Sequence, residues 1–410
     1  MSSLVDDWIT TTLGDFASLQ RGHDLPEPAR NPGDVPVMGS FGITGSHSVS
    51  SARGPGVTVG RSGASIGVVS YIDCDYWPLN TCLYVTDFHG NNPRFVYYFL
   101  KTLDLASFNS GSAQPSLNRN YIHPVEIDVP QRTEQDAIAT LLRALDDKIE
   151  LNRQTNETLE ALARALFKDW FVDFGPTRTK AEGGAPYLAP ELWALFPDAL
   201  DDEDKPVGWV DRPLKSFGEI VTGKTPSTKR PEYFGGAVPF LKIPDMHGKM
   251  YVLETLSSLS LEGAQSQSKK TLPSGSISVS CIATPGLVVL NHRETQTNQQ
   301  INSLVPTAPE QSFFLYWSCL QLAIEVMLGG SGGSVFHNMN KTSFGNLNIH
   351  YPTDELAKFF SSAVSPFHDG ILANEHESQT LAQTRDLLLP KLMSGELRLR
   401  DAEREVEAVL

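Results

Sequence analysis

The chain has 410 residues, of which 40% are hydrophobic and 20% are charged. Since roughly 100–200 residues form one domain, this composition predicts a globular protein of two to four domains. The longest apolar stretch, Phe313 to Leu328, is interrupted by Ser318, Gln321 and Glu325, which argues against a membrane span.

The ends and the cysteines carry no targeting or metal signal. No basic segment followed by an apolar run opens the chain, so no signal peptide is expected. The four cysteines form no C-x-x-C pair, so neither a zinc cluster nor a disulfide framework is indicated. We therefore expect a soluble, cytoplasmic protein without a metal site.

The net charge of −15 argues at first against DNA as a partner, because phosphate binding needs lysine and arginine. The charge is unevenly distributed, however. Residues 132–204 hold 8 basic and 16 acidic side chains, whereas residues 205–353 hold 12 basic and 9 acidic ones. The net charge of the whole chain is therefore a poor guide to its partners.

Two stretches of the chain alternate short apolar runs with loops rich in glycine and proline, which predicts short strands in two mixed α/β domains. The candidate strands of the first stretch are Val35–Met38, Val57–Arg61, Val68–Ile72 and Leu83–Thr86. Those of the second are Val238–Ile243, Ile277–Ile282, Leu287–Leu290 and Ile301–Val305.

An internal duplication relates the two stretches. Residues 114–130 align without gaps to 336–352, so that Asn118 meets Asn340 and Arg119 meets Lys341. Aromatic helices at 95–100 and 313–318 also correspond, and a loop rich in glycine and serine follows each of them. The chain therefore reads as two copies of one cassette.

A long helical pattern follows each cassette. Apolar residues recur at steps of three, four or seven from Ile138 to Trp170, and the same rhythm returns 222 residues later. This pattern predicts two helices that pair as a coiled coil, with Asn152 and Asn374 fixing its register. The alternative is two amphipathic helices that each pack on a local partner.

The resulting domain prediction is 1–131 and 209–353 as recognition domains, 132–174 and 354–410 as spacer helices (the second with a C-terminal tail), and 175–208 as a linker.

One catalytic motif needs consideration. Residues 218–225, GEIVTGKT, satisfy the P-loop pattern G-x-x-x-x-G-K-[ST], which would make Lys224 part of a nucleotide hydrolase. Pro226 follows directly and disfavours a helical Thr225, which a P-loop requires. The other catalytic patterns that we sought are missing from the sequence, so a binding protein is favoured over an enzyme. A protein–protein scaffold without DNA contact stays open as a further alternative.

Two similar heads held by antiparallel helices would suit two half-sites on duplex DNA, with the helices fixing the gap between them. At this point the residues carry a family resemblance. The stretches W-x-x-x-x-L-G-x-F, GRSGASIG, QPSLNRNYI, QRTEQDAIATLLRALDDKIELN, ALARALFKDWFVDF and LLLPKLMSGELRL together resemble the specificity subunit of type I DNA restriction–modification enzymes over essentially the whole chain. The second cassette departs from this pattern, with SCIATPGLVV in place of the glycine-rich strand and Phe336 in place of Gln114.

The resemblance implies a fold and a set of partners. The expected fold is α+β, with two mixed α/β target-recognition domains separated by two long antiparallel helices in a coiled coil with pseudo-two-fold symmetry. The chain is expected to be non-catalytic, to read a bipartite asymmetric target on double-stranded DNA, and to dock methyltransferase subunits on its helices. S-adenosylmethionine would bind those subunits and no cofactor would bind this chain. A restriction–translocase subunit would join the complex.

Base reading needs donors and acceptors on exposed loops, such as arginine for guanine and asparagine or glutamine for adenine. Glycines would let the backbone approach phosphates. The candidates in the first cassette are Arg21, Gly22, Arg61, Ser62, Gly63, Gln114, Asn118 and Arg119. Those in the second are Lys224, Thr225, Lys229, Arg230, Asn298, Gln299, Asn338, Asn340 and Lys341. The alternative role of any one of them is a solvated turn or a helix cap.

Partner docking is expected from exposed apolar residues late in the two helices. The candidates are Phe167, Trp170, Phe171, Phe174, Leu389, Leu392 and Met393. The alternative is that these residues close the ends of the coiled coil, which suits Trp170 equally well.

Overall fold

A computed structural model describes residues 8–109, 116–282, 284–328, 339–407 and 409. The chain divides into two compact units. Unit 1 comprises residues 1–151 and 377–410, and unit 2 comprises residues 152–376. Two 40-residue helices, α4 (Arg132–Phe171) and α11 (Asp354–Met393), each contribute one half to either unit. The predicted spacer helices are thus integral parts of the two units.

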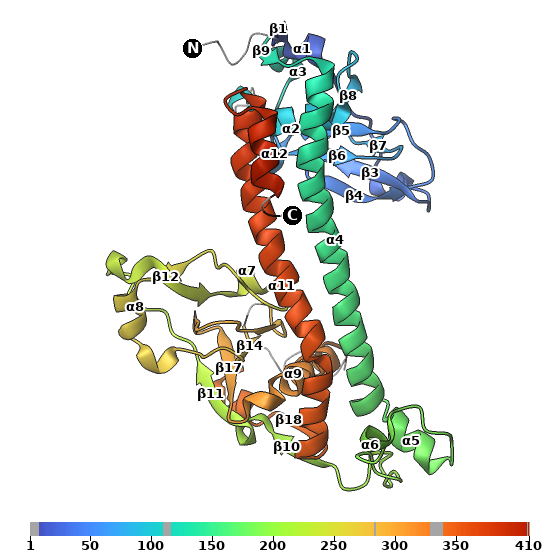
Figure 1. Ribbon diagram of the computed structural model, residues 1–410, viewed down its shortest axis with the longest axis vertical. Helices are drawn as coiled ribbons and strands as arrows, with labels where there is room; N and C mark the ends of the chain where they lie inside the picture. The colour runs from blue at the N-terminus through green and yellow to red at the C-terminus, as the bar shows by residue number, and fades with distance from the viewer. Residues whose placement is uncertain (1–7, 110–115, 283, 329–338, 408, 410) are drawn as a thin grey trace. The chain divides into compact units, whose positions relative to one another are not determined.

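Unit 1 contains a globular first head, formed by the described residues between 8 and 131, together with half of each long helix (Figure 1). Its strands are β1 (Ile9–Thr12), β2 (Ser18–Arg21), β3 (Val35–Gly39), β4 (Gly42–His47), β5 (Gly56–Gly60), β6 (Val69–Ile72), β7 (Trp77–Pro78), β8 (Cys82–Asp87) and β9 (Glu126–Val129). Its shorter helices are α1 (Leu13–Phe16), α2 (Pro93–Thr102), α3 (Arg119–Ile122) and α12 (Leu399–Glu407).

Unit 2 contains the second head, formed by the described residues between 209 and 353. Its strands are β10 (Val210–Pro213), β11 (Gly218–Thr222), β12 (Phe234–Leu241), β13 (Ser258–Leu259), β14 (Ile277–Ser280), β15 (Val288–Leu290), β16 (Gln296–Thr297), β17 (Ile301–Pro306) and β18 (Asn348–Tyr351). Its shorter helices are α5 (Gly175–Ala181), α6 (Pro190–Trp193), α7 (Ile243–Met246), α8 (Leu261–Gln265), α9 (Ser312–Leu328) and α10 (Lys341–Gly345).

The two heads share one sheet topology. Each has an antiparallel four-stranded sheet, in the order β2-β8-β5-β6 in the first head and β11-β17-β14-β15 in the second. Each also has a three-stranded sheet with one parallel pair (β4-β3-β7 and β13-β12-β16) and a two-stranded sheet (β1-β9 and β10-β18). The α+β fold and the duplication expected from the sequence are therefore confirmed.

The long helices pair in an antiparallel sense within each unit. In unit 1, Nη1 of Arg385 lies 2.7 Å from a carboxylate oxygen of Asp146, and Nζ of Lys148 lies 3.1 Å from the Glu377 carboxylate. Residue numbers therefore rise along α4 where they fall along α11, which defines an antiparallel pair. The apolar seam between them, from Ile138 to Leu145 and from Leu381 to Met393, belongs to the core of the first head.

Asparagines interrupt the apolar seam in unit 2. The Asn374 amide donates to Oδ1 of Asn156 at 2.8 Å, and the Asn152 amide donates to the Asn374 carbonyl oxygen at 3.4 Å. Asn152 is buried. Asn152 and Asn374, which the sequence predicted to fix the register, are thus joined by Asn156, whose side-chain oxygen is the acceptor for Asn374.

The segment that was expected to be a linker, residues 175–208, folds against the end of α4. It contains α5 and α6, and the rings of Phe196 and Trp170 meet edge to face with centroids 5.6 Å apart. Lys180 fixes the fold-back by donating to the Phe196 carbonyl oxygen at 2.6 Å. The glycine, proline and aspartate content suggested an open chain, but a few apolar residues such as Leu192 and Phe196 anchor it.

None of the helices in the described residues combines the length and the apolar character that crossing a bilayer requires.

Candidate nucleic-acid interface

A shallow depression on the first head brings together four of the residues that the sequence singled out. It has a volume of about 360 Å³ and is lined by Gln20, Arg21, Arg61, Leu83, Leu117, Asn118, Arg119 and Asn120. The described lining thus contains three guanidinium groups and no carboxylate. Guanidinium groups match the geometry of phosphate oxygens and of the guanine edge, so this depression suits a nucleic acid.

The backbone around Arg61 fixes this arrangement. Arg61 directly follows strand β5, and its N–H donates to the Thr81 carbonyl at 3.0 Å. Its own carbonyl accepts from the Leu117 N–H at 2.8 Å, which carries the segment before α3 to the edge of the sheet. Ser62 continues this contact through a bridge to Ser116. Residues about 55 positions apart in the chain are therefore held side by side.

Backbone carbonyls orient two of the three guanidinium groups. Nη1 of Arg61 lies 3.3 Å from the Asn80 carbonyl oxygen, and Nη1 of Arg119 lies 3.4 Å from that of Leu19. Arg21 is the exception, since its guanidinium lies 3.6 Å from the exposed carboxylate of Asp24. A neutral carbonyl directs a guanidinium without cancelling its charge, so Arg61 and Arg119 keep their attraction for an anion.

Asn118 and Asn340 occupy equivalent helix caps. Oδ1 of Asn118 accepts from the Asn120 N–H at 3.0 Å at the start of α3, and Oδ1 of Asn340 accepts from the Ser343 N–H at 2.9 Å at the start of α10. Both side chains are exposed. The alternative role of a helix cap therefore applies to both, and a base contact remains open only to the amide N–H groups.

The two candidate glycines of the first head have different surroundings. Gly63 has a φ of +71° and open space beside it. Gly22 is buried, and a Cβ atom there would lie 2.2 Å from the Leu79 carbonyl oxygen. Gly223 makes the equivalent contact, 2.2 Å from the Asn298 carbonyl oxygen. Gly22 therefore serves internal packing, and its expected approach to a phosphate is wrong.

The second head presents a loop of exposed cations after β11. Lys224, Lys229 and Arg230 are exposed on it, and Oγ1 of Thr225 donates to Oε1 of Gln299 at 2.8 Å. No helix follows the strand here, because residues 223–230 form an irregular loop in which the Lys224 N–H donates to the Thr297 carbonyl. A P-loop needs helix N-terminal amides at this place, so the nucleotide-hydrolase alternative is not favoured.

The remaining candidates of the second head divide three ways. Lys341 is exposed at the start of α10. Asn298 is only 8% exposed, and its amide donates to Oε1 of Gln300 while its Oδ1 accepts from the Gln300 N–H. Its burial and these internal hydrogen bonds argue against the expected role in base reading. Gln114 and Asn338 lie outside the described residues.

Matching backbone hydrogen bonds reveal which residue replaces Arg61 in the second head. The Cys281 N–H donates to the Gln300 carbonyl at 2.9 Å, and the Cys281 carbonyl accepts from the Met339 N–H at 3.4 Å, as those of Arg61 do in the first head. The Cys281 thiol is buried, which raises its pKa.

Strand pairing gives two further exchanges. Arg21 pairs with Leu83, whereas Thr222 pairs with Asn302 at the same place of the second head. Two of the three cationic positions of the depression are thus neutral in the second head, while Lys341 keeps the positive charge at the position of Arg119.

Two polar lining residues, Gln20 and Asn120, were missed by the sequence prediction, as were the apolar Leu83 and Leu117. The signal for Gln20 was its place beside Arg21 at the end of a strand, and that for Asn120 was the repeated asparagine in NRN.

The apolar residues expected to dock partners are largely buried, so the expectation that they are exposed is wrong. Trp170, Leu389, Leu392 and Met393 belong to the hydrophobic cores of the two units. Their seam positions bring them against α11 or α4, and in unit 2 the folded-back segment covers Trp170 as well.

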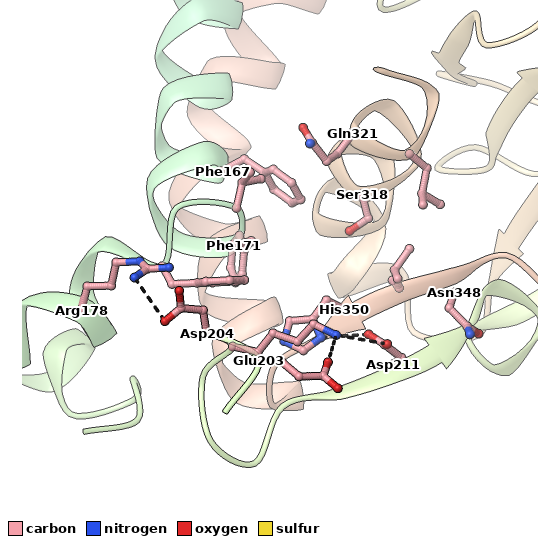
Figure 2. A pocket seen from close by; sticks show the side chains of 15 residues that line it. Phe167, Phe171, Arg178, Glu203, Asp204, Asp211, Ser318, Gln321, Asn348 and His350 are labelled. Atoms are coloured by element: carbon pink, nitrogen blue, oxygen red, sulfur yellow. Dashed lines mark hydrogen bonds and ion pairs between the residues drawn. The ribbon is translucent and has the colours of Figure 1, made fainter. Parts of the chain in front are cut away.

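Phe167, Phe171 and Phe174 nevertheless line one wall of a pocket of about 460 Å³ in unit 2 (Figure 2). Figure 2 shows Ser318 and Gln321 of α9 on another side of the pocket. The remaining lining residues are Val172, Arg178 of α5, Leu322 of α9, Asp211, three residues of β18 and the loop residues Glu203, Asp204 and Lys205.

His350 places a polar atom in this lining. Its Nδ1 lies 2.9 Å from the Asp211 carboxylate, whereas its Nε2 is buried without a hydrogen-bond partner among the described residues. The pocket therefore combines aromatic walls, a mostly acidic loop and one unpaired ring nitrogen. An apolar side chain of a partner that carries a nearby N–H donor would fit it.

The described residues contain no group of three or more histidine, cysteine, aspartate or glutamate side chains that could hold a metal ion.

Comparison with known proteins places the chain in a family. The family described as "Type I restriction modification DNA specificity domain" matches residues 5–161 and 206–382. The specificity subunit of the type I restriction enzyme HindI from Haemophilus influenzae is 34% identical, over 79% of this chain and 82% of that protein. The specificity subunit of MjaIX from Methanocaldococcus jannaschii is 26% identical, over 75% of this chain and 70% of that one.

A solved structure has the same fold. The S subunit of a type I restriction–modification system from M. genitalium superposes with a TM-score of 0.60 at 16% identity, covering 94% of this chain and 96% of that chain.

Proposed function

The chain belongs to the family of type I restriction–modification DNA specificity subunits, and from this premise we propose that each of its heads reads one half of a bipartite, asymmetric site on double-stranded DNA. Specificity subunits are non-catalytic, so this chain supplies recognition to a larger complex. One observation carries the proposal: the heads share a topology yet place Arg61 and Cys281 at the same position. Heads that differ at equivalent positions would select different sequences.

The first head would bind its half-site through the depression around Arg61. Arginine can contact the O6 and N7 atoms of guanine with two hydrogen bonds, and the neighbouring Arg21 and Arg119 would hold flanking phosphates. Ser62 and Asn118 offer adaptable contacts beside them. The second head would use Lys224, Lys229 and Arg230 on its loop, together with Gln299, Lys341 and neighbouring polar residues.

The partner that performs the chemistry would be a methyltransferase subunit that binds S-adenosylmethionine. It would dock on the helices of unit 2 by inserting an apolar side chain into the pocket lined by Phe167, Phe171 and Phe174. The carboxylates of this lining already pair with Arg178 and Lys205, so the aromatic walls would supply most of the docking contact. A restriction–translocase subunit would join the same complex.

Co-expression of this chain with methyltransferase subunits, followed by mapping of methylated bases in the host genome, tests the reading function. The expected result is one motif of two separated half-sites with unequal sequences. A palindromic motif, a continuous motif or methylation without sequence preference would contradict the proposal.

Filling the pocket tests the docking function. Ser318→Phe places a ring in the pocket, and we expect it to weaken co-purification with the methyltransferase subunit by about tenfold or more, since one buried aromatic anchor contributes about 2 kcal/mol to an interface. Ser266→Phe, on the second head outside the pocket lining, serves as the matched control. Unchanged co-purification of a folded Ser318→Phe chain would exclude this pocket.

A further inference from the structure

Strands β3 and β4 of the first head lie side by side (Figure 1) and form a hairpin whose tip carries an exposed aromatic residue. Gly39 and Gly42 form the last pair of the ladder, so Ser40 and Phe41 make a two-residue connection. The side chain of Phe41 is 76% exposed, and that of Ile43 on the adjoining strand is 66% exposed. Two large apolar side chains therefore face water at one hairpin end.

Local structure gives no reason for a phenylalanine here. The left-handed backbone angle of this turn falls on Gly42, with a φ of +99°, and not on Ser40 or Phe41, so the turn geometry does not select an aromatic residue. A ring that is three-quarters exposed also adds little to the core. Phe41 and Ile43 together form an exposed apolar patch of the kind that marks interaction sites.

The hairpin tip lies against the residue that precedes Arg61. A Cβ atom on Gly60 would come within 2.4 Å of the Ser40 carbonyl oxygen, so glycine is needed there for the close approach. A Cβ atom on Gly42 would lie 3.6 Å from Oγ of Ser70 in β6. The tip therefore rests on the β5–β6 edge, directly beside the cationic depression that Arg61 lines.

We propose that Phe41 is an apolar wedge that enters the DNA at the half-site read by the first head. The proposal rests on the proposed function, since it assumes that the depression holds DNA. The hairpin tip contacts the residue next to Arg61, and the depression that Arg61 lines holds three guanidinium groups that attract a polyanion, which favours DNA over an apolar protein surface as the occupant. Phosphates bound by Arg21 or Arg119 would bring the bases to the ring, where apolar side chains unstack a base step or stack on it.

The wedge belongs to the first head alone. In the second head, β12 corresponds to β3 through its parallel pairing with β16, but the chain then enters α7 instead of turning back as a hairpin. Its partner strand β13 begins only at Ser258. The two half-sites would therefore be distorted to different degrees.

The test uses the assembled complex of this chain with its methyltransferase subunits. The DNA duplexes carry the sequence motif that methylation mapping identifies. We compare Phe41→Ala, Phe41→Trp and the control Val49→Ala, which removes an exposed apolar side chain elsewhere in the first head. Binding is measured by fluorescence anisotropy at several salt concentrations. Each half-site is also scrambled in turn.

We expect Phe41→Ala to weaken binding by about 5- to 100-fold, the range typical for loss of one stacking ring, without changing the salt dependence. Phe41→Trp and Val49→Ala should bind like the parent chain. The difference in affinity between Phe41→Ala and the parent chain should vanish when the half-site read by the first head is scrambled, and should persist when the other half-site is scrambled. Because Phe41 is exposed, the Tm of the variant should stay that of the parent.

Three outcomes would overturn the wedge. If Phe41→Ala binds like the parent chain at every salt concentration, Phe41 is not a wedge, and the proposed reading function is unaffected. An equal loss in Val49→Ala would indicate a general apolar surface. Impaired assembly with the methyltransferase subunits would assign Phe41 to protein docking. A parent complex that binds all duplexes alike would instead contradict the reading function itself.

Discussion

At the scale of single residues, a carboxylate on α4 joins the first head to both long helices. Asp146 accepts from the Tyr98 hydroxyl of α2 at 2.5 Å and from Nη1 of Arg385 on α11 at 2.7 Å. The Asp146 side chain is only partly exposed, as is that of Arg385. The neighbouring Asp147 instead pairs with Arg143 on the surface of α4. The sequence suggests a uniform acidic face, but the two aspartates have different roles.

Removing the inner carboxylate is expected to destabilise the protein far more than removing the outer one. Asp146→Ala leaves the Tyr98 hydroxyl and Nη1 of Arg385 without their acceptor, although Asp386 still accepts from the other side of the guanidinium, and the loss costs about 2 kcal/mol in free energy of unfolding. Asp147→Ala should cost about 0.5 kcal/mol or less, as is usual for an exposed i, i+4 pair. Urea denaturation measures both. Equal losses would show that the Tyr98–Asp146–Arg385 network contributes nothing beyond a surface pair.

A buried histidine in unit 2 makes stability depend on pH. His368 is fully buried, its Nε2 accepts from the Trp317 indole N–H at 3.0 Å, and its Nδ1 lies 3.2 Å from the Tyr251 hydroxyl. Burial lowers the pKa of His368 to about 3, well below the value near 6.5 of an unfolded chain. The folded state therefore holds the ring neutral, while the unfolded state takes up a proton below about pH 6.5.

The free energy of unfolding should accordingly fall as the pH drops from about 6.5 towards 3, and His368 should contribute no pH dependence above that window. The slope from this residue reaches about 1.4 kcal/mol per pH unit. Urea denaturation at pH 7.5, 6 and 5 measures it. His368→Gln is expected to lower stability at pH 7.5 but to flatten the slope. An unchanged slope in the variant would mean that other groups cause it.

At the scale of elements, the sequence predicts the regular parts of the fold well. All eight candidate strands correspond to observed strands, with ends shifted by a few residues, because runs of valine, isoleucine and leucine bounded by glycine or proline are a strong local signal. The long helices also follow from their apolar rhythm. Short edge strands such as β4, in GITGSH, were missed because their side chains are mostly exposed and give no alternation.

The polar part of the helix seam makes a prediction of its own. Asn374→Ala removes the amide that donates to Oδ1 of Asn156. The side-chain carbonyl of Asn156 then lacks its donor, which should lower the free energy of unfolding by about 1–2 kcal/mol. Replacing both Asn156 and Asn374 by leucine should instead raise the Tm, because the seam becomes apolar. The same change should weaken the preference for one register of the two helices. Calorimetry measures the Tm, and light scattering detects mispaired or oligomeric chains. A lower Tm of the double variant would contradict the seam assignment.

The docking residues show where sequence reasoning stops. Phe167, Trp170 and Phe171 lie on a helix end rich in aromatics, which resembles an exposed interaction surface. Whether such a face is covered depends on segments far away in the chain, here α9 and the stretch around Phe196. Periodicity describes one helix at a time, so it gives no information about that cover.

At the scale of the whole molecule, the repeat and the family follow from the sequence, whereas the contacts that distinguish the heads do not. The segments around Arg61 and Cys281 correspond in the sequence, but their letters do not fix a residue-by-residue register, which the matching backbone hydrogen bonds supply. Asn298 resembles a loop donor in the sequence, yet long-range contacts bury it. Candidate interface residues are therefore named reliably only once the sheet is known.

Loss of the Arg61 guanidinium should affect one half-site only. Arg61→Ala is expected to reduce the slope of log Kd against log salt concentration by about 1 if the group binds phosphate, or to relax one base position by about 1–3 kcal/mol if it reads guanine. Lys101→Ala, an exposed cation of the same head on α2, is the matched control. Binding titrations and methylation mapping with the variant complex measure both effects. An unchanged slope and motif would remove Arg61 from the interface.

The discontinuous make-up of unit 1 has a consequence during protein synthesis. Unit 2 is one continuous stretch, so every residue of it is added before residues 377–410. The first head, although translated earliest, receives Leu381, Leu388 and Leu392 of its core only after unit 2. Until these leucines have been added and have left the ribosome, the apolar side of α4 that faces them stays bare, which makes the nascent first head a natural client for chaperones.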